Sequence, residues 1–202
     1  MSITSARFVW PIGDDVVLIP RTPAIAGPYH ELVAANHDRL AAWSPGIAEA
    51  TPEGTRAALE RSGTAWVAGT RLPLAVGVRA EGGHRLVGAV SLAVDAAAAS
   101  AEAGFWIAAE AEGRGIAGRA LSAVLGYAFG DLGLHRVEMR TLTTNDRSRR
   151  LAERLGFTLE GVLRGAARFP DGPRDVALYA LLAPPAAIPG RPSSQEWTAT
   201  SG

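Results

Sequence analysis

The sequence predicts one domain with a mixed α/β (α+β) fold, in which helices flank a mostly antiparallel sheet of about seven strands. Apolar runs on both sides of the glycine-rich turn EGGH (81–84) are typical of an antiparallel hairpin. A helical pattern over 116–129 lies between two strand-like runs, which makes a βαβ unit whose strands should be parallel. The turn PDG (170–172) separates two final strand-like runs. One parallel pair inside an antiparallel sheet is therefore expected.

The N-terminal part of the chain is expected to hold one strand and the first helices. The strand is expected over 16–21, and the helices over 24–36, 37–43 and 52–62. The last helix has a clear start, because Thr51 is a suitable N-cap and Pro52 is favoured at the first helical position. Gly63 is expected to end this helix.

The central part is expected to form a strand meander and then the βαβ unit. Strands are expected over 71–80, 85–94, 102–109 and 135–142. The helix between the last two strands carries apolar residues at three- and four-residue spacing, namely Ile116, Ala117, Ala120, Leu121, Val124, Leu125, Ala128 and Phe129. Gly130 and Gly133 bracket the end of this helix.

The C-terminal part is expected to complete the sheet. A helix over 145–155 has Asn145 as its N-cap and Gly156 at its end. Strands are expected over 157–163 and 176–182. They would be the last elements before the chain becomes rich in Pro, Ser and Ala.

The domain is therefore expected to span residues 1–183. Residues 184–202 are expected to be a loosely docked tail with Trp197 as its one large anchor. A length of 202 residues suits one well-filled core rather than two.

Composition excludes several classes of protein. Hydrophobic residues make up 48% and charged residues 20% of the chain, as in a soluble globular domain. There is no signal-peptide pattern and no apolar run long enough to span a membrane, so a cytoplasmic protein without membrane association is expected. A formal net charge of zero argues against general nucleic-acid binding.

Composition also limits the chemistry. The chain has no cysteine, so a thiolate nucleophile and a thiolate metal site are excluded. Every basic residue is an arginine, so a Schiff-base or P-loop lysine is excluded. The four histidines lack metal-ligand spacing, and no metal is expected.

The segment FWIAAEAEGRGIAGRA (105–120) carries the strongest functional signal, because a strand ends and a helix begins around three glycines. Gly113, Gly115 and Gly118 would let the backbone approach a phosphate, and the first helical turn offers unpaired N–H groups. The side chain of Arg114 would add a charged donor.

Two other interpretations of this segment are open. The glycines could serve only as a tight turn with close helix packing. Their spacing also fits the dinucleotide fingerprint G-x-G-x-x-G, for which Glu138 stands near the position of the expected acidic residue. The antiparallel meander upstream argues against that fingerprint, since a doubly wound sheet needs several βαβ units.

The loop E-G-R-G-I-A (112–117) resembles the acyl-CoA pyrophosphate loop of the GNAT superfamily of N-acetyltransferases. The block NDRSRRLAERLGFTLEGVLR (145–164) is similar to the N-x-x-S…G-F-x-x-E-G-x-x-R block of its ribosomal-protein-alanine N-acetyltransferase type. HDRLAAWSP (37–45) and RDVALYALL (174–182) resemble an N-terminal segment and the closing strand of that type. These motifs occur in the family's order over roughly residues 16–182.

The resemblance implies a GNAT fold whose parallel pair is splayed, and direct transfer of an acetyl or related acyl group from acyl-CoA to a primary amine. It assigns protonation of the leaving thiolate to Ser148. It assigns acyl-CoA binding to the backbone of the central strand, to the loop and to the next helix, through Ile107, Ala108, Gly113, Arg114, Gly115, Ile116, Ala117, Gly118 and Asn145. It implies acyl-CoA as co-substrate, an amine acceptor that is a protein N-terminus or a small molecule, and a homodimer to which the tail could contribute.

The chain departs from the family pattern at several positions. Glu112 stands where Gln or Arg is usual, and Arg119 where the type often has Glu. Ala152 and Ala167 replace a family tyrosine and a glutamate. Glu102 and His135 are candidates for the general base, and neither is assigned that role.

Three functions follow from these observations. The first is an acyl-CoA-dependent N-acyltransferase. The second is a non-catalytic acyl-CoA-binding module on the same fold, which the departures keep open. The third is a nucleotide-dependent oxidoreductase. The sequence names neither the acceptor nor the acyl group.

Overall fold

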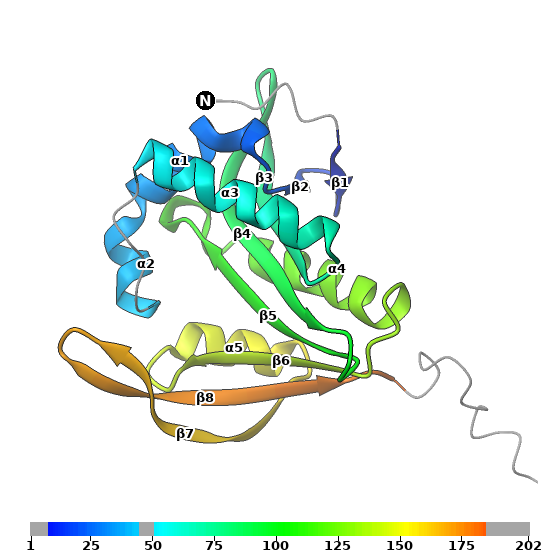
Figure 1. Ribbon diagram of the computed structural model, residues 1–202, viewed down its shortest axis with the longest axis vertical. Helices are drawn as coiled ribbons and strands as arrows, with labels where there is room; N and C mark the ends of the chain where they lie inside the picture. Colours follow the sequence, from blue (N-terminus) through cyan, green and yellow to red (C-terminus); the bar gives the residue numbers. More distant parts are fainter. Residues whose placement is uncertain (1–7, 45–50, 185–202) are drawn as a thin grey trace, which may run out of the picture.

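The computed structural model describes residues 8–44 and 51–184, in which five α-helices and two short 3₁₀ helices flank one sheet of eight strands (Figure 1). The strands are β1 (Trp10–Pro11), β2 (Val16–Pro20), β3 (Arg71–Ala80), β4 (Gly83–Asp95), β5 (Ser100–Ile107), β6 (Arg136–Leu142), β7 (Thr158–Phe169) and β8 (Gly172–Leu182). The helices are α1 (Ala26–Ala35), α2 (His37–Trp43), α3 (Pro52–Val67), α4 (Ile116–Gly130) and α5 (Asp146–Arg154), with 3₁₀ helices at Pro23–Ile25 and Ala109–Ala111.

The strand order is β1-β2-β3-β4-β5-β6-β8-β7, and only β5 and β6 run parallel. Their pairing starts at Ser100 and Arg136 and ends at Ala103 and Met139. Beyond that point the two strands diverge, and Figure 1 shows them as the arms of a V with α2 near its open end. The predicted α+β class and splayed parallel pair are confirmed. The two-residue strand β1 was not predicted.

The helices cover the sheet on both faces. Tyr29 and Leu32 of α1 and Leu59 of α3 are buried against β2, β3 and β4, on what we call the α1/α3 face. Leu121 and Val124 of α4 are fully buried on the opposite face, together with core residues of α5. We call this the α4/α5 face. The two apolar layers hold the central strands, and hence the ends of β5 and β6, in fixed positions.

Helix α3 confirms its predicted start and corrects its predicted end. The hydroxyl oxygen of Thr51 accepts a hydrogen bond from the Gly54 N–H at 3.0 Å, as an N-cap does. The helix continues past Gly63 to Val67. It ends where Gly69 takes a φ of 70° and the Thr70 N–H donates to the Ala65 carbonyl, the bonding of a Schellman cap. Gly63 lacks that left-handed backbone and therefore does not stop the helix.

The C-terminal elements differ from the predictions mainly in length. Strands β7 and β8 are longer than predicted, so that only Pro170 and Asp171 lie between them. The predicted tail, with Trp197, lies outside the described residues except for its first residue, Pro184.

Candidate active site

A cavity of about 1080 Å³ lies where β5 and β6 separate. Its lining comes from the ends of both strands, from the loop before α4, from α5, and from α2 on the α1/α3 face. It is therefore open to both faces of the sheet, and two ligands can meet between the strands. The predicted site residues that line it are Ile107, Gly113, Gly115, Ile116, Ala117, Gly118, Asn145 and Ser148.

The end of β5 presents unpaired backbone groups to the cavity. The Ala108 N–H donates to the Val87 carbonyl of β4 at 2.8 Å. Successive N–H groups of a strand point to opposite sides, so the N–H groups of Phe105 and Ile107 point away from β4 and toward β6. The pairing of β5 with β6 ends at Ala103, so β6 offers these N–H groups no partner. Ile107 thus lies where it was predicted. Ala108 is fully buried, its N–H is already bonded, and it does not line the cavity, so the structure does not support it as a ligand donor.

The glycine loop takes a backbone shape that other residues rarely adopt. Gly113 has a φ of 74° and Gly115 a φ of 69°, and Gly115 directly precedes α4. The Arg119 N–H donates to the Gly115 carbonyl as the first intrahelical bond. The N–H groups of the three residues in between therefore have no partner within the helix and lie at its positive end. This geometry suits a diphosphate.

The side chain of Arg114 does not join this loop in the cavity. It is absent from the lining, and its guanidinium lies 4.0 Å from a carboxylate oxygen of Asp15 in the turn before β2. Arg119 donates to the same carboxylate at 2.6 Å, and this hydrogen bond holds the pKa of Asp15 below its usual value. Both arginines thus link the N-terminal hairpin to the loop and first turn of α4, and the predicted phosphate contact of Arg114 stays a prediction.

Helix α5 brings Asn145 and Ser148 to the opposite wall. The side-chain oxygen of Asn145 accepts a hydrogen bond from the Ser148 N–H at 3.1 Å, so Asn145 is the N-cap of this helix. This bond uses the backbone of Ser148, and both side chains also line the cavity. Ala152, at the family's tyrosine position, is fully buried in the core instead. Ser148 is therefore the hydroxyl that α5 presents here.

A family comparison agrees with this geometry. The model of the acetyltransferase (GNAT) domain matches residues 15–158, well over half of the chain. The chain belongs to the GNAT acetyltransferase family.

The solved structures of relatives have the same fold. Mycobacterium smegmatis RimJ, in complex with a CoA disulfide, gives a TM-score of 0.76 at 25% identity and covers 91% of this chain and 90% of its own. A RimL ribosomal L7/L12 α-N-protein acetyltransferase in complex with coenzyme A gives 0.81 at 21% identity, covering 87% of this chain and 98% of its own. At that identity RimL shows the fold alone.

The chain spans about half the length of the curated relatives it matches. One of them is "Putative ribosomal N-acetyltransferase YdaF" of Bacillus subtilis (strain 168), which is 39% identical over 98 residues, 48% of this chain and 54% of that protein.

Glu112, the unusual first residue of the GNAT loop, joins two helices across the cavity. It accepts hydrogen bonds from Arg39 of α2 and from Arg147 of α5, and all three side chains line the cavity. Partial burial alone would raise the pKa of Glu112, but the two arginines outweigh it and the pKa lies below its usual value. Sequence reasoning missed this contact, because the arginines lie 73 and 35 residues away along the chain.

Glu112→Gln is expected to lower stability by about 1 kcal/mol at pH 7, since it removes the anion between two largely exposed arginines. The folded pKa is depressed, so this contribution is complete above the unfolded pKa of about 4.3 and is lost as the pH falls through the folded value. Urea unfolding of both proteins from pH 3 to 7 measures the difference. Glu60→Gln, in an exposed pair within α3, is the control and should change stability less. A difference that does not shrink as the pH falls from 7 to 3 would contradict the ion-pair explanation.

The arginines of α5 have two separate roles. Arg147 and Arg154 line the cavity, where they are placed to meet phosphate groups. Arg149 turns inward and donates to the hydroxyl of the buried Tyr179 at 3.2 Å and to the Thr143 carbonyl at 3.1 Å. Arg149 therefore anchors the start of α5, which carries Asn145.

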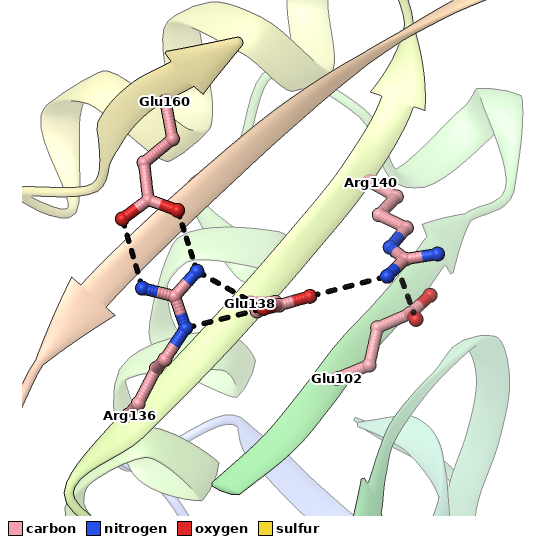
Figure 2. Close-up of polar contacts among 5 residues, drawn as sticks. All are labelled: Glu102, Arg136, Glu138, Arg140 and Glu160. Carbon is pink, nitrogen blue, oxygen red and sulfur yellow. Dashed lines mark hydrogen bonds and ion pairs between the residues drawn. The ribbon is translucent and has the colours of Figure 1, made fainter. Parts of the chain in front are cut away.

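Glu102, a candidate general base, and Glu138, the acidic residue of the dinucleotide alternative, lie outside the cavity. They belong to an ion-pair network on the α1/α3 side of β5, β6 and β7 (Figure 2). Glu102 lies 3.5 Å from Arg140, and Glu138 bonds to both Arg140 and Arg136. A carboxylate held by arginines on an exposed sheet face is a poor general base. Glu138 also lacks the setting of a dinucleotide site, because the sheet has one parallel pair and is not doubly wound.

The remaining positions considered for the general base, His135 and Ala167, do not supply one. His135 is exposed and does not line the cavity. Ala167 lies in a small separate apolar cluster. Within residues 8–44 and 51–184, no group of three or more His, Asp or Glu side chains could hold a metal ion, and no helix is long and apolar enough to cross a membrane.

Proposed function

We propose that this chain is an acyl-CoA-dependent N-acyltransferase that moves an acetyl or related acyl group to a primary amine by direct attack in a ternary complex. One observation carries the proposal: the cavity between β5 and β6 brings free strand N–H groups, a helix N-terminus and a hydroxyl together at a place open to both faces of the sheet. Membership of the GNAT family and the CoA complex of RimJ support it.

Each part of the cavity has a task in this reaction. The pantetheine arm can pair with the free edge of β5 as an added strand. The diphosphate fits the N–H groups at the start of α4, where no carboxylate but Glu112 lines the cavity among the described residues. The N–H of Ile107 can stabilise the oxyanion that forms when the amine attacks the thioester carbon. When this intermediate collapses, the C–S bond breaks and the Ser148 hydroxyl can give the thiolate its proton.

The amine must lose a proton, and the lining offers little help. Glu112 is the one carboxylate among the described lining residues, and its low pKa makes it a weak base near neutral pH. An α-amine with a pKa of about 7.7–8.0 is already partly neutral there, whereas a lysine side chain is not. This favours a protein or peptide N-terminus, or a small amine of low pKa, as the acceptor.

Calorimetric titration with acetyl-CoA, succinyl-CoA and NADH, followed by a transfer assay with a panel of amines, tests the function. Saturable thioester binding with transfer to an amine supports it. Binding without transfer to any amine would favour the non-catalytic acyl-CoA-binding module. Binding of NADH alone would favour the oxidoreductase, which the mostly antiparallel sheet does not support.

Ser148→Ala is expected to lower kcat about 100-fold, at the lower end of the range for general acid catalysis, and to leave acetyl-CoA affinity nearly unchanged. The cap of α5 is retained, because Asn145 bonds the backbone N–H of this residue. Steady-state kinetics over pH, with Ser122→Ala on the exposed side of α4 as control, measures the effect. Wild-type kcat in the variant would remove Ser148 from the mechanism.

We further propose that residues 1–183 form a single GNAT N-acyltransferase domain, that the protein works in the cytoplasm, and that it is a homodimer. Exposed apolar side chains on the edge strand β7, with Leu159 at 44% and Val162 at 49% exposure, are consistent with a contact between copies. Light scattering of the full chain and of residues 1–183 tests the oligomeric state and the role of the tail.

A further inference from the structure

The cavity carries more positive charge than acyl-CoA binding on one face explains. Its described lining includes six arginines and one carboxylate, and the arginines are Arg21, Arg39, Arg71, Arg140, Arg147 and Arg154. Glu112 neutralises two of them, and the network in Figure 2 neutralises Arg140. Among the described residues, no carboxylate lies within ion-pair distance of the other three. Arg154 belongs to α5, on the same face of the sheet as α4 and its glycine loop, which leaves Arg21 and Arg71 to be explained.

The strand register places these two arginines together on the α1/α3 face. The Arg21 N–H donates to the Pro73 carbonyl at 2.9 Å, and Ile19, two residues earlier, is buried against α1 and α3. Arg71 is two residues from Pro73 on β3, so its side chain is on the same face and diagonal to Arg21, within reach for two long side chains. The pair thus lies on the opposite face from α4 and its glycine loop.

The same register leads from this pair to the splayed strands. Pro73 is opposite Ser91 on β4, and Ser91 is opposite Gly104 on β5, the first residue beyond the parallel pairing. Ser91 and Gly104 both line the cavity. A row of Pro73, Ser91 and Gly104 therefore leads from Arg21 to the place where β5 and β6 begin to separate.

Arg21 is held in place without a counter-charge. It donates from Nη1 to the Tyr29 hydroxyl at 3.1 Å, and its guanidinium carbon lies 5.9 Å from the centre of that ring. Its Nε is inaccessible to solvent and has no partner among the described residues. A partly buried cation with one neutral partner loses hydration without gaining an ion pair, and a bound anion would offset that loss. Guanidinium groups suit a pair of oxygens on a carboxylate or a phosphate, to which they donate two parallel hydrogen bonds.

We propose that Arg21 and Arg71 bind an oxyanion, a carboxylate or a phosphate, that the amine acceptor itself carries. The proposal deepens the acyltransferase function and rests on it for the meaning of "acceptor". It gives the enzyme a substrate class: amines with an acidic group, from either a small phosphorylated amine or a peptide with an acidic side chain near its N-terminus.

Ligand pairs with and without the anionic group test the site. Calorimetry gives dissociation constants for alanyl-glutamate amide against alanyl-glutamine amide, and for O-phosphoethanolamine against ethanolamine, with and without saturating CoA. The proteins are wild type, Arg21→Gln, Arg71→Gln and the control Arg61→Gln, an exposed arginine of α3 outside the cavity. Arg21→Lys tests for the two-pronged contact that a lysine cannot make. Thermal unfolding checks that each variant is folded.

Wild type and Arg61→Gln are expected to prefer one anionic ligand over its neutral partner, and Arg21→Gln to lose about 10- to 100-fold of its affinity, the range for hydrogen bonds to a charged group. Arg71→Gln should lose less, because its side chain is exposed. The pair that shows the preference identifies peptide carboxylate or phosphate as the source of the anion. The anion site is refuted if wild type binds the anionic and the neutral ligand of each pair equally well. It is also refuted if Arg21→Gln and Arg71→Gln keep the wild-type preference for the anionic ligand. Either result leaves the acyltransferase proposal standing. Charge-dependent binding with no transfer to any amine would support the site and defeat the proposed reaction.

Discussion

Gly115→Asp is expected to lower acetyl-CoA affinity by at least about 100-fold, or about 2.7 kcal/mol, while the protein still folds. The backbone at this position has a φ of 69°, which Asp tolerates better than most residues, and a Cβ there would meet no atom within 4 Å. The loss therefore comes from a carboxylate placed beside the N–H groups that would hold the diphosphate. Two like charges about 4 Å apart repel by about 4 kcal/mol near a protein surface.

Gly115→Asn separates charge from shape in the same experiment. Its side chain has the same size and a similar tolerance of left-handed backbone, but no charge. We expect Gly115→Asn to lose about tenfold in acetyl-CoA affinity at most. Calorimetry of wild type and both variants at two salt concentrations measures the difference in affinity between the Asp and Asn variants. An affinity for acetyl-CoA that is unchanged in the Asp variant would mean that this loop does not hold the diphosphate.

The loop and the helix cap could be predicted because their causes are local. Glycine is the residue that takes a positive φ without strain, so Gly113 and Gly115 mark the turn in the sequence itself. Asn145 caps the helix that begins one residue later. The order of the family motifs then supplied the splayed pair, which no local pattern shows.

The contacts that the sequence did not predict depend on the tertiary fold. The N–H of Ala108 donates to β4 because of strand parity, which the sequence alone did not show. Arg114 follows a glycine of the loop, yet its side chain turns to Asp15 near the start of the chain. No sequence pattern marked Arg21 and Arg71 as a pair, because they come together only when β2 pairs with β3. Neighbouring residues determine the local backbone conformation, whereas the tertiary structure determines which groups a side chain contacts.

Gly88→Ala is expected to destabilise the protein by about 3 kcal/mol, the upper part of the range for overpacking, and to weaken acetyl-CoA binding as well. A Cβ on Gly88 would lie 2.2 Å from the Trp106 carbonyl oxygen and 3.0 Å from the Ile107 Cα. Both are backbone atoms of β5, so no side-chain rotation relieves the clash and the end of the strand must move. That end carries the N–H of Ile107, which the mechanism needs at the oxyanion.

Gly126→Ala is the matched control, because this exposed glycine lies inside α4 and a Cβ there meets nothing within 4 Å. We expect it to stabilise the protein by about 0.5–1 kcal/mol through helix propensity and to leave binding unchanged. Urea unfolding and acetyl-CoA titration of both variants give stability and affinity separately. If Gly88→Ala loses stability but binds acetyl-CoA like wild type, the end of β5 does not position the ligand, and the role given to Ile107 fails with it. If stability and affinity fall together in Gly88→Ala while the control binds acetyl-CoA like wild type, the close approach of β4 and β5 at Gly88 is what holds the oxyanion donor in place.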